Sequence, residues 1–146
     1  MEIMTLFKQV AKHLTGRDVM FRWQEPVWNN TSGAAYKSLS GDAIIDVNPG
    51  ASDPVYTFLH ECAHVRLDFS QMAPSAYWRC EPGSQITPEA ERAELRALPR
   101  EDRADQLAKI WLDYSKRYAW RYFAPTLFEG QLLALVDYPK MEIEND

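Results

Sequence analysis

The chain has 146 residues with 46% hydrophobic content, which predicts a single domain with a buried core over residues 1–140 and a frayed tail at 141–146. A net charge of -5, with basic residues interleaved among acidic ones, argues against direct binding of nucleic acid through its phosphates. No stretch has the features of a signal peptide or a membrane span, and two cysteines make no disulfide framework, so we expect a cytoplasmic protein.

The first third of the chain predicts one helix and three strands. Apolar residues at three- and four-residue spacing over 4–14 indicate an amphipathic helix, which Gly16 ends. A short apolar and aromatic run at 18–26 is a strand candidate. Residues 34–39 and 43–47 predict two further strands joined by a Ser-Gly-Asp turn, and the second of these could pair with an extended peptide.

Helices are predicted for most of the rest. With Ser52 or Asp53 as the N-cap and Pro54 at the first helical position, a helix is expected to run to about Phe69. Start signals and apolar spacing then predict three later helices: one at 87–98, one that begins at Pro99 with apolar spacing from Glu101 onward, and one from Pro125 onward.

The helix that starts at Pro54 carries two of the chain's three histidines, in the order His60, Glu61, Cys62, Ala63, His64. Residues four apart lie roughly 40° apart around a helix, so His60 and His64 can reach one metal ion, and their imidazoles suit zinc. Glu61 is placed to reach a water on that ion and to take its proton during attack on a carbonyl. Cys62 lies roughly 160–200° around the helix from both histidines, so we predict a buried hydrophobe rather than a ligand. The alternative is a helix in which the two histidines occur by chance.

Two histidines need at least one more ligand, and a glutamate from a later helix is a common choice. Glu101 is preferred because it shares a helix face with Asp105 beside the apolar stripe, and Glu94 is the next choice. Asp105 could accept the second N–H of a histidine ligand, although an acid in a first helical turn often only complements the helix dipole. The full set of glutamate candidates is Glu81, Glu89, Glu91, Glu94, Glu101 and Glu129.

Two aromatic residues, Tyr77 and Trp78, follow the histidine helix on a loop that contains prolines. They could line a substrate pocket or donate a hydrogen bond to an oxyanion. Aromatic packing over the edge of the core is the alternative, and it is the more common role for such residues.

Taken together, these motifs resemble the ImmA/IrrE family of HExxH metallopeptidases. The family has a strand that ends in Asn-Pro, a helix with HExxH, and a later helix with Glu-x-x-Ala-(Asn/Asp)-x-x-Ala; here the matching stretches are 44–49, 60–64 and 101–108. The resemblance covers about residues 1–120. It implies an α+β, gluzincin-like domain in which a short antiparallel sheet packs on helices and HExxH lies on a central helix.

The expected function is that of a zinc-dependent endopeptidase acting on a protein or peptide substrate. His60, His64 and Glu101 would bind Zn²⁺, Glu61 would be the general base, and Asp105 would orient a histidine. The resemblance implies that the substrate is a regulatory or repressor protein of a mobile element or stress response. The alternatives are a zinc-containing module that binds a regulator without cutting it, and a purely structural zinc site. No membrane contact is expected, and the sequence predicts no oligomeric state.

Overall fold

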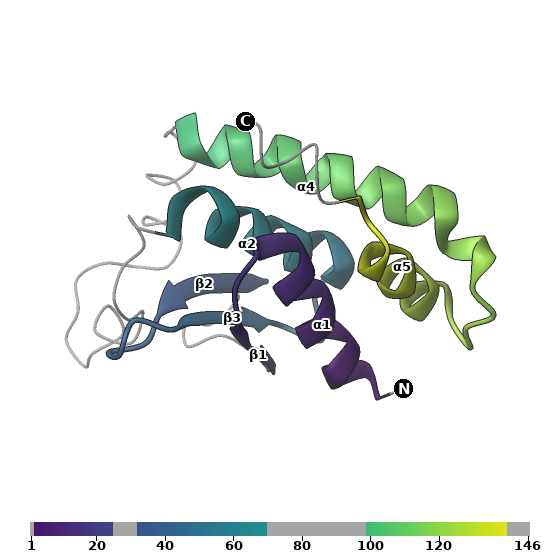
Figure 1. Ribbon diagram of the computed structural model, residues 1–146, viewed down its shortest axis with the longest axis horizontal. Coiled ribbons are helices and arrows are strands. Elements are labelled where there is room, and N and C mark those ends of the chain that lie inside the picture. Colours follow the sequence, from purple (N-terminus) through teal and green to yellow (C-terminus); the bar gives the residue numbers. More distant parts are fainter. Residues whose placement is uncertain (1, 25–31, 70–98, 140–146) are drawn as a thin grey trace.

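A computed structural model describes residues 2–24, 32–69 and 99–139 of the chain. Within these ranges the protein is a small α+β domain with four α-helices, one 3-10 helix and a three-stranded sheet (Figure 1). The elements in chain order are α1 (Ile3–Thr15), β1 (Val19–Trp23), β2 (Gly33–Lys37), β3 (Ala43–Val47), α2 (Pro54–Asp68), α4 (Pro99–Tyr118), η3 (Ala119–Arg121) and α5 (Leu127–Val136).

The sheet has the strand order β1-β3-β2, with β3 in the centre. β3 runs antiparallel to β2 and parallel to β1, with Val19 opposite Ala43 and Trp23 opposite Val47. The chain reverses between β1 and β2 and again between β2 and β3, so the first and third strands point the same way. The expected antiparallel sheet is therefore wrong for the β1–β3 pair, and the sheet is mixed.

The central position of β3 also corrects a functional expectation. Both edges of this strand are hydrogen-bonded to neighbouring strands. A strand that is paired on both sides has no free backbone groups for an added peptide. The prediction that residues 43–47 could pair with an extended peptide is therefore wrong.

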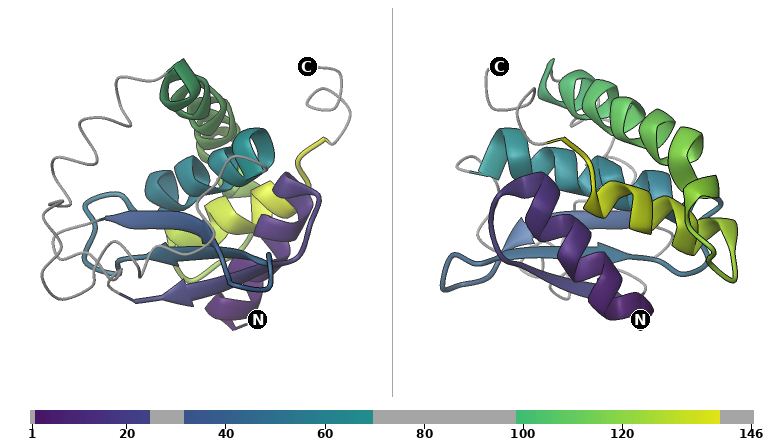
Figure 2. Two further views of the ribbon diagram at one scale, coloured as in Figure 1. Left: turned by 90° about the vertical axis from the view of Figure 1, so that its left-hand side faces the viewer. Right: turned by 45° about the vertical axis from the view of Figure 1, so that its right-hand side comes forward.

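The helices cover one face of the sheet in two layers. α1 packs on β1 and α2 packs on β2 and β3, while α4 lies on the far side of α2 from the sheet (Figures 1 and 2). α5 contacts both α1 and α4 at one end of the molecule. This arrangement makes α2 the central helix, as predicted.

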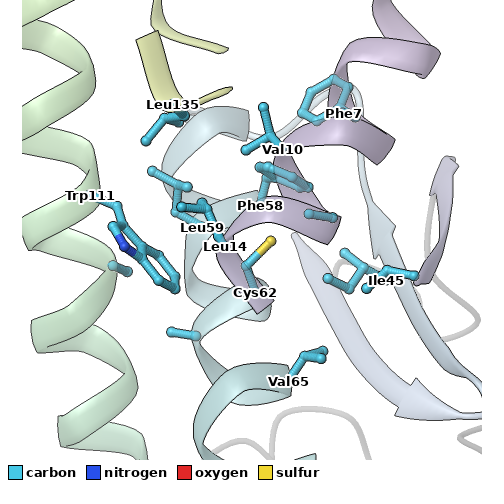
Figure 3. Close-up of a cluster of buried hydrophobic side chains, with 14 of the residues drawn as sticks. Phe7, Val10, Leu14, Ile45, Phe58, Leu59, Cys62, Val65, Trp111 and Leu135 are labelled. Atoms are coloured by element: carbon cyan, nitrogen blue, oxygen red, sulfur yellow. The ribbon is translucent and has the colours of Figure 1, made fainter. Parts of the chain in front are cut away.

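The main core lies between the sheet and the helices. Phe7 of α1 stacks on Phe21 of β1 with ring centroids 4.3 Å apart, and Phe58 of α2 meets both rings edge-on. Figure 3 shows Phe58, Cys62 and Val65 in this core, whereas Leu59 of the same helix lies toward Trp111 of α4. Because α2 is buried on two sides, its two histidines lie on the narrow face that remains, beside the start of α4.

The predicted element boundaries hold with small shifts. The strand at 43–47 has the expected bounds, the histidine helix ends at Asp68, and the long helix begins at Pro99. The last helix begins at Leu127, because Thr126 is its N-cap and accepts a hydrogen bond from the backbone N–H of Glu129. The predicted helix at 87–98 and the tail at 141–146 lie outside the described residues. Across those that are described, no helix has the length and hydropathy needed to cross a bilayer.

Candidate metal centre

The start of α2 fixes the register of the candidate ligands. Asp53 caps the helix, since its Oδ1 accepts a hydrogen bond from the backbone N–H of Tyr56 at 3.0 Å. Pro54 takes the first helical position, where its missing N–H is not needed. Of the two predicted N-caps, the structure therefore selects Asp53 over Ser52.

One face of α2 carries polar side chains at every fourth position. These side chains meet residues near the start of α4, whose N-terminal turns lie beside the second half of α2. Four residues make up this stripe: Tyr56, His60, His64 and Asp68.

The three predicted metal ligands converge on one point. Nε2 of His60 lies 2.7 Å from Oε1 of Glu101, and Nε2 of His64 lies 3.0 Å from Oε2 of the same carboxylate. The two Nε2 atoms are 3.1 Å apart. Within the described ranges, this trio is the group of metal-binding side chains whose ligand atoms all lie within 4.8 Å of one another. The choice of Glu101 from sequence thus agrees with the structure.

The donor set fits a zinc ion. Two imidazole nitrogens and one carboxylate oxygen are the protein ligands of many catalytic zinc sites. Bonds of about 2.1 Å to a tetrahedral ion place its ligand atoms about 3.4 Å from one another. The observed separations of 2.7–3.1 Å would have to open by about 0.3–0.7 Å to reach this value. Both Nε2 atoms face each other and the Glu101 carboxylate, so an ion between the three side chains would take up the lone pairs of both imidazoles.

Charge interactions and hydrogen bonds within the trio shift the pKa values of all three side chains. Burial lowers the pKa of His64, but hydrogen bonding to Glu101 and the charge of Glu61 outweigh it and raise that pKa to about 9. The pKa of His60 is raised by the same balance. Burial opposes ionisation of Glu101, yet its hydrogen bonds with both histidines hold its pKa well below the usual range. The site is thus a compact cationic–anionic cluster that an entering metal cation must reorganise.

Glu61 lies beside this cluster without being one of its members. Glu61 directly follows His60 on α2 and is 8% exposed, and its charge raises the pKa of both histidines. Gly33 of β2 makes room for it: a Cβ at Gly33 would lie 3.4 Å from Cγ of Glu61 and 2.5 Å from Cγ2 of Thr57. The close approach of β2 to α2 therefore depends on the missing side chain at Gly33.

The predicted role of Asp105 is only partly matched by its contacts. Its Oδ1 lies 2.9 Å from Nδ1 of His60, but the two atoms are not aligned for a hydrogen bond. The same oxygen accepts a hydrogen bond from the Tyr56 hydroxyl at 2.7 Å. The tyrosine was missed from sequence, although its position one turn before His60 was a usable signal.

A second carboxylate near the ligands was also missed. Oδ2 of Asp68 lies 3.1 Å from Nδ1 of His64, and its side chain is 3% exposed. Asp68 follows His64 by four residues, as His64 follows His60, so the spacing alone could have indicated it.

The remaining candidates separate into two groups. Cys62 is fully buried in the core, and burial raises the pKa of its thiol well above the usual value, so the prediction of a buried hydrophobe is confirmed. Glu129 lies in the first turn of α5 and is not part of the metal-binding trio. The other candidates lie outside the described residues: Tyr77, Trp78, Glu81, Glu89, Glu91 and Glu94.

Comparison with protein-family models, with curated proteins and with solved structures gave no match. The geometry of the trio and the motif that its residues form are therefore the features that bear on function. What the structure shows is a group of two histidines and one glutamate that could hold a metal ion.

Proposed function

We propose that the protein is a zinc-dependent endopeptidase of the ImmA/IrrE type. The observation that carries this proposal is the convergence of His60, His64 and Glu101, with a further carboxylate, Glu61, beside the cluster but outside it. A purely structural zinc site has no use for that additional acid, because four closed protein ligands suffice there. Three protein ligands with a neighbouring base are what hydrolysis requires.

The reaction divides between the ligands and the base. His60, His64 and Glu101 would hold zinc, which when bound polarises a carbonyl and makes water easier to deprotonate at neutral pH. Glu61 takes the proton from the water as it attacks the peptide carbonyl, and then passes that proton to the leaving amine. The buried side of α2, with Phe58, Cys62 and Val65 in the core, holds this helix in place. The positions of His60 and His64 are therefore set before substrate binds.

The substrate we propose is a regulatory protein, with a repressor encoded nearby as the first to be tested. This part of the proposal rests on the resemblance of the HExxH helix and the Glu101–Ala108 segment to the family. Cleavage of a folded regulator by a cytoplasmic enzyme needs no membrane contact and no nucleic-acid contact.

Glu61→Gln tests the catalytic role, because the amide keeps the size of the side chain and removes its capacity as a base. We expect the variant to retain about one zinc per chain by elemental analysis, since Glu61 is not a ligand. Cleavage of the candidate repressor, followed by gel electrophoresis and mass spectrometry, should fall by about 10²–10⁴-fold.

The control is Glu129→Gln, which changes an acid of α5 outside the trio and should leave both readings unchanged. If Glu61→Gln abolishes the protein's effect on the regulator, catalysis is the function. An unchanged effect with zinc retained would contradict the enzyme and favour the zinc-containing interaction module.

A further inference from the structure

We infer that Asp68, and not the predicted Asp105, is the main positioning residue of the metal centre, and that it holds His64 with Nε2 directed at the ion. This inference rests on the proposed zinc site and adds to it a residue that the HExxH pattern does not contain. Three features of the structure carry it: a hydrogen bond, a costly location, and the contrast with Asp105.

The hydrogen bond sets which nitrogen of His64 is free. Asp68 Oδ2 accepts from Nδ1 of His64 at 3.1 Å, so Nδ1 carries a proton and Nε2 is left to bind a metal. Nε2 then faces Nε2 of His60 and the carboxylate of Glu101. A carboxylate behind a histidine ligand fixes the ring and makes the ligand more basic.

Without its contact to His64, the location of Asp68 would be energetically unfavourable. It is the last residue of α2, where a negative charge opposes the helix dipole, and its side chain is almost fully buried. Within the part of the chain that the structure describes, its Oδ1 has no hydrogen bond, and Nη2 of Arg103 lies 3.5 Å from it. Arg103 is largely exposed, so it offsets only part of the cost of burying the carboxylate. The pairing with His64 is the contact that explains an acid at this position.

Asp105 is held less firmly and serves another partner. Its side chain is 40% exposed, its oxygen is out of line with Nδ1 of His60, and that oxygen accepts from Tyr56 instead. The two histidines are therefore supported unequally, with His64 the better oriented of the two.

The experiment compares zinc affinity across substitutions in the purified full-length chain, by competition with a chromophoric chelator. Asp68→Ala should weaken zinc binding by about 10–100-fold, the usual effect of removing such a partner. Asp68→Asn should weaken it less, because the amide oxygen still accepts the Nδ1 proton but carries no charge. Asp105→Ala should weaken it less than Asp68→Ala does.

Cobalt spectra supply a reading that a general loss of stability would not move. Co²⁺ bound in place of zinc should show a shifted visible absorption spectrum in Asp68→Ala, because the ring of His64 is no longer fixed. Asp46→Asn is the matched control: Asp46 is fully buried, but it pairs with Arg22 and Tyr36 and is not part of the zinc-binding trio. It should lower stability and leave both zinc affinity and the cobalt spectrum unchanged.

Each outcome decides the inference. Wild-type zinc affinity in Asp68→Asn and Asp68→Ala, or a larger loss in Asp105→Ala, would overturn it while leaving the zinc site intact. Should Asp68→Ala fail to fold, Asp68→Asn decides alone, and affinity equal to wild type refutes the role. A wild-type chain that binds no zinc overturns the proposed function and this inference together.

Discussion

Glu101 is the residue on which the centre depends most, because its two oxygens meet both histidines at once. His60 and His64 come from one helix and are brought together by spacing alone, whereas Glu101 comes from α4 and needs the tertiary fold. The three side chains are mostly buried, with 13–16% of each exposed, so a small substrate group or water can still reach them. Shelter of this degree strengthens electrostatic contacts without closing the site.

The protonation of His64 predicts how zinc binding responds to pH. With its pKa raised to about 9, the metal-free ring carries a proton at neutral pH, and zinc must displace that proton. Apparent zinc affinity should therefore rise with pH, by about tenfold per unit for one proton, and level off above about pH 9. Titration calorimetry in two buffers of different ionisation enthalpy measures the protons released. A flat affinity between about pH 6.5 and 9, with no proton release, would contradict a protonated His64.

The close packing around Gly33 predicts the effect of adding a side chain there. An added Cβ would lie 2.5 Å from Cγ2 of Thr57 and 3.1 Å from the backbone oxygen of Asp46, so Gly33→Ala must push β2 away from α2. We expect the free energy of unfolding to fall by about 1–3 kcal/mol, measured by urea denaturation.

Thr57, the residue that the new Cβ would clash with, supplies the control for Gly33→Ala. Thr57→Ser removes the methyl group that the new Cβ would strike, so the double variant should regain part of the lost stability. Equal stability of the single variant and the wild type would show that β2 and α2 are not in close contact here.

At the scale of elements, local signals were reliable and neighbour relations were not. The bounds of β3 and the start of α2 were predicted because a short apolar run between turn residues and a proline with its cap act locally. The direction of β1 beside β3 was not, because an apolar strand pattern does not say which strand lies next to it.

The same division applies to the site. His60, Glu61 and His64 follow from helical spacing, and Glu101 follows from a second motif on a helix face. Tyr56 was missed because its partner, Asp105, lies on α4, whose rotation against α2 no local pattern encodes. Asp68 was missed although its contact with His64 lies within α2 and follows from the four-residue spacing.

The cap of α2 gives a prediction for this element. Asp53→Ala removes the acceptor for the Tyr56 backbone N–H and should lower the free energy of unfolding by about 1 kcal/mol. Ser52→Ala is the matched control, since the neighbouring hydroxyl does not cap the helix, and its effect should stay within about 0.5 kcal/mol. Chemical denaturation measures both variants; a larger loss for Ser52→Ala would place the cap one residue earlier.

For the whole molecule, the metal centre joins two helices that are far apart in sequence. α2 packs against the sheet and α4 packs on α2, so an ion held by His60, His64 and Glu101 would fasten the outer layer to the middle one. An unfolded chain cannot bring these ligands together, so zinc should bind the folded state selectively and stabilise it. Free zinc at about a thousandfold above its dissociation constant would add about 4 kcal/mol.

Thermal unfolding with and without zinc therefore shows whether the three ligands form a metal centre, when the wild type, Glu101→Ala and Glu61→Gln are compared. We expect zinc to raise the Tm of the wild type and of Glu61→Gln by similar amounts, because Glu61 is a base and not a ligand. We expect little or no rise for Glu101→Ala. A wild-type Tm that zinc does not change, or a full rise in Glu101→Ala, would contradict a metal centre built from His60, His64 and Glu101.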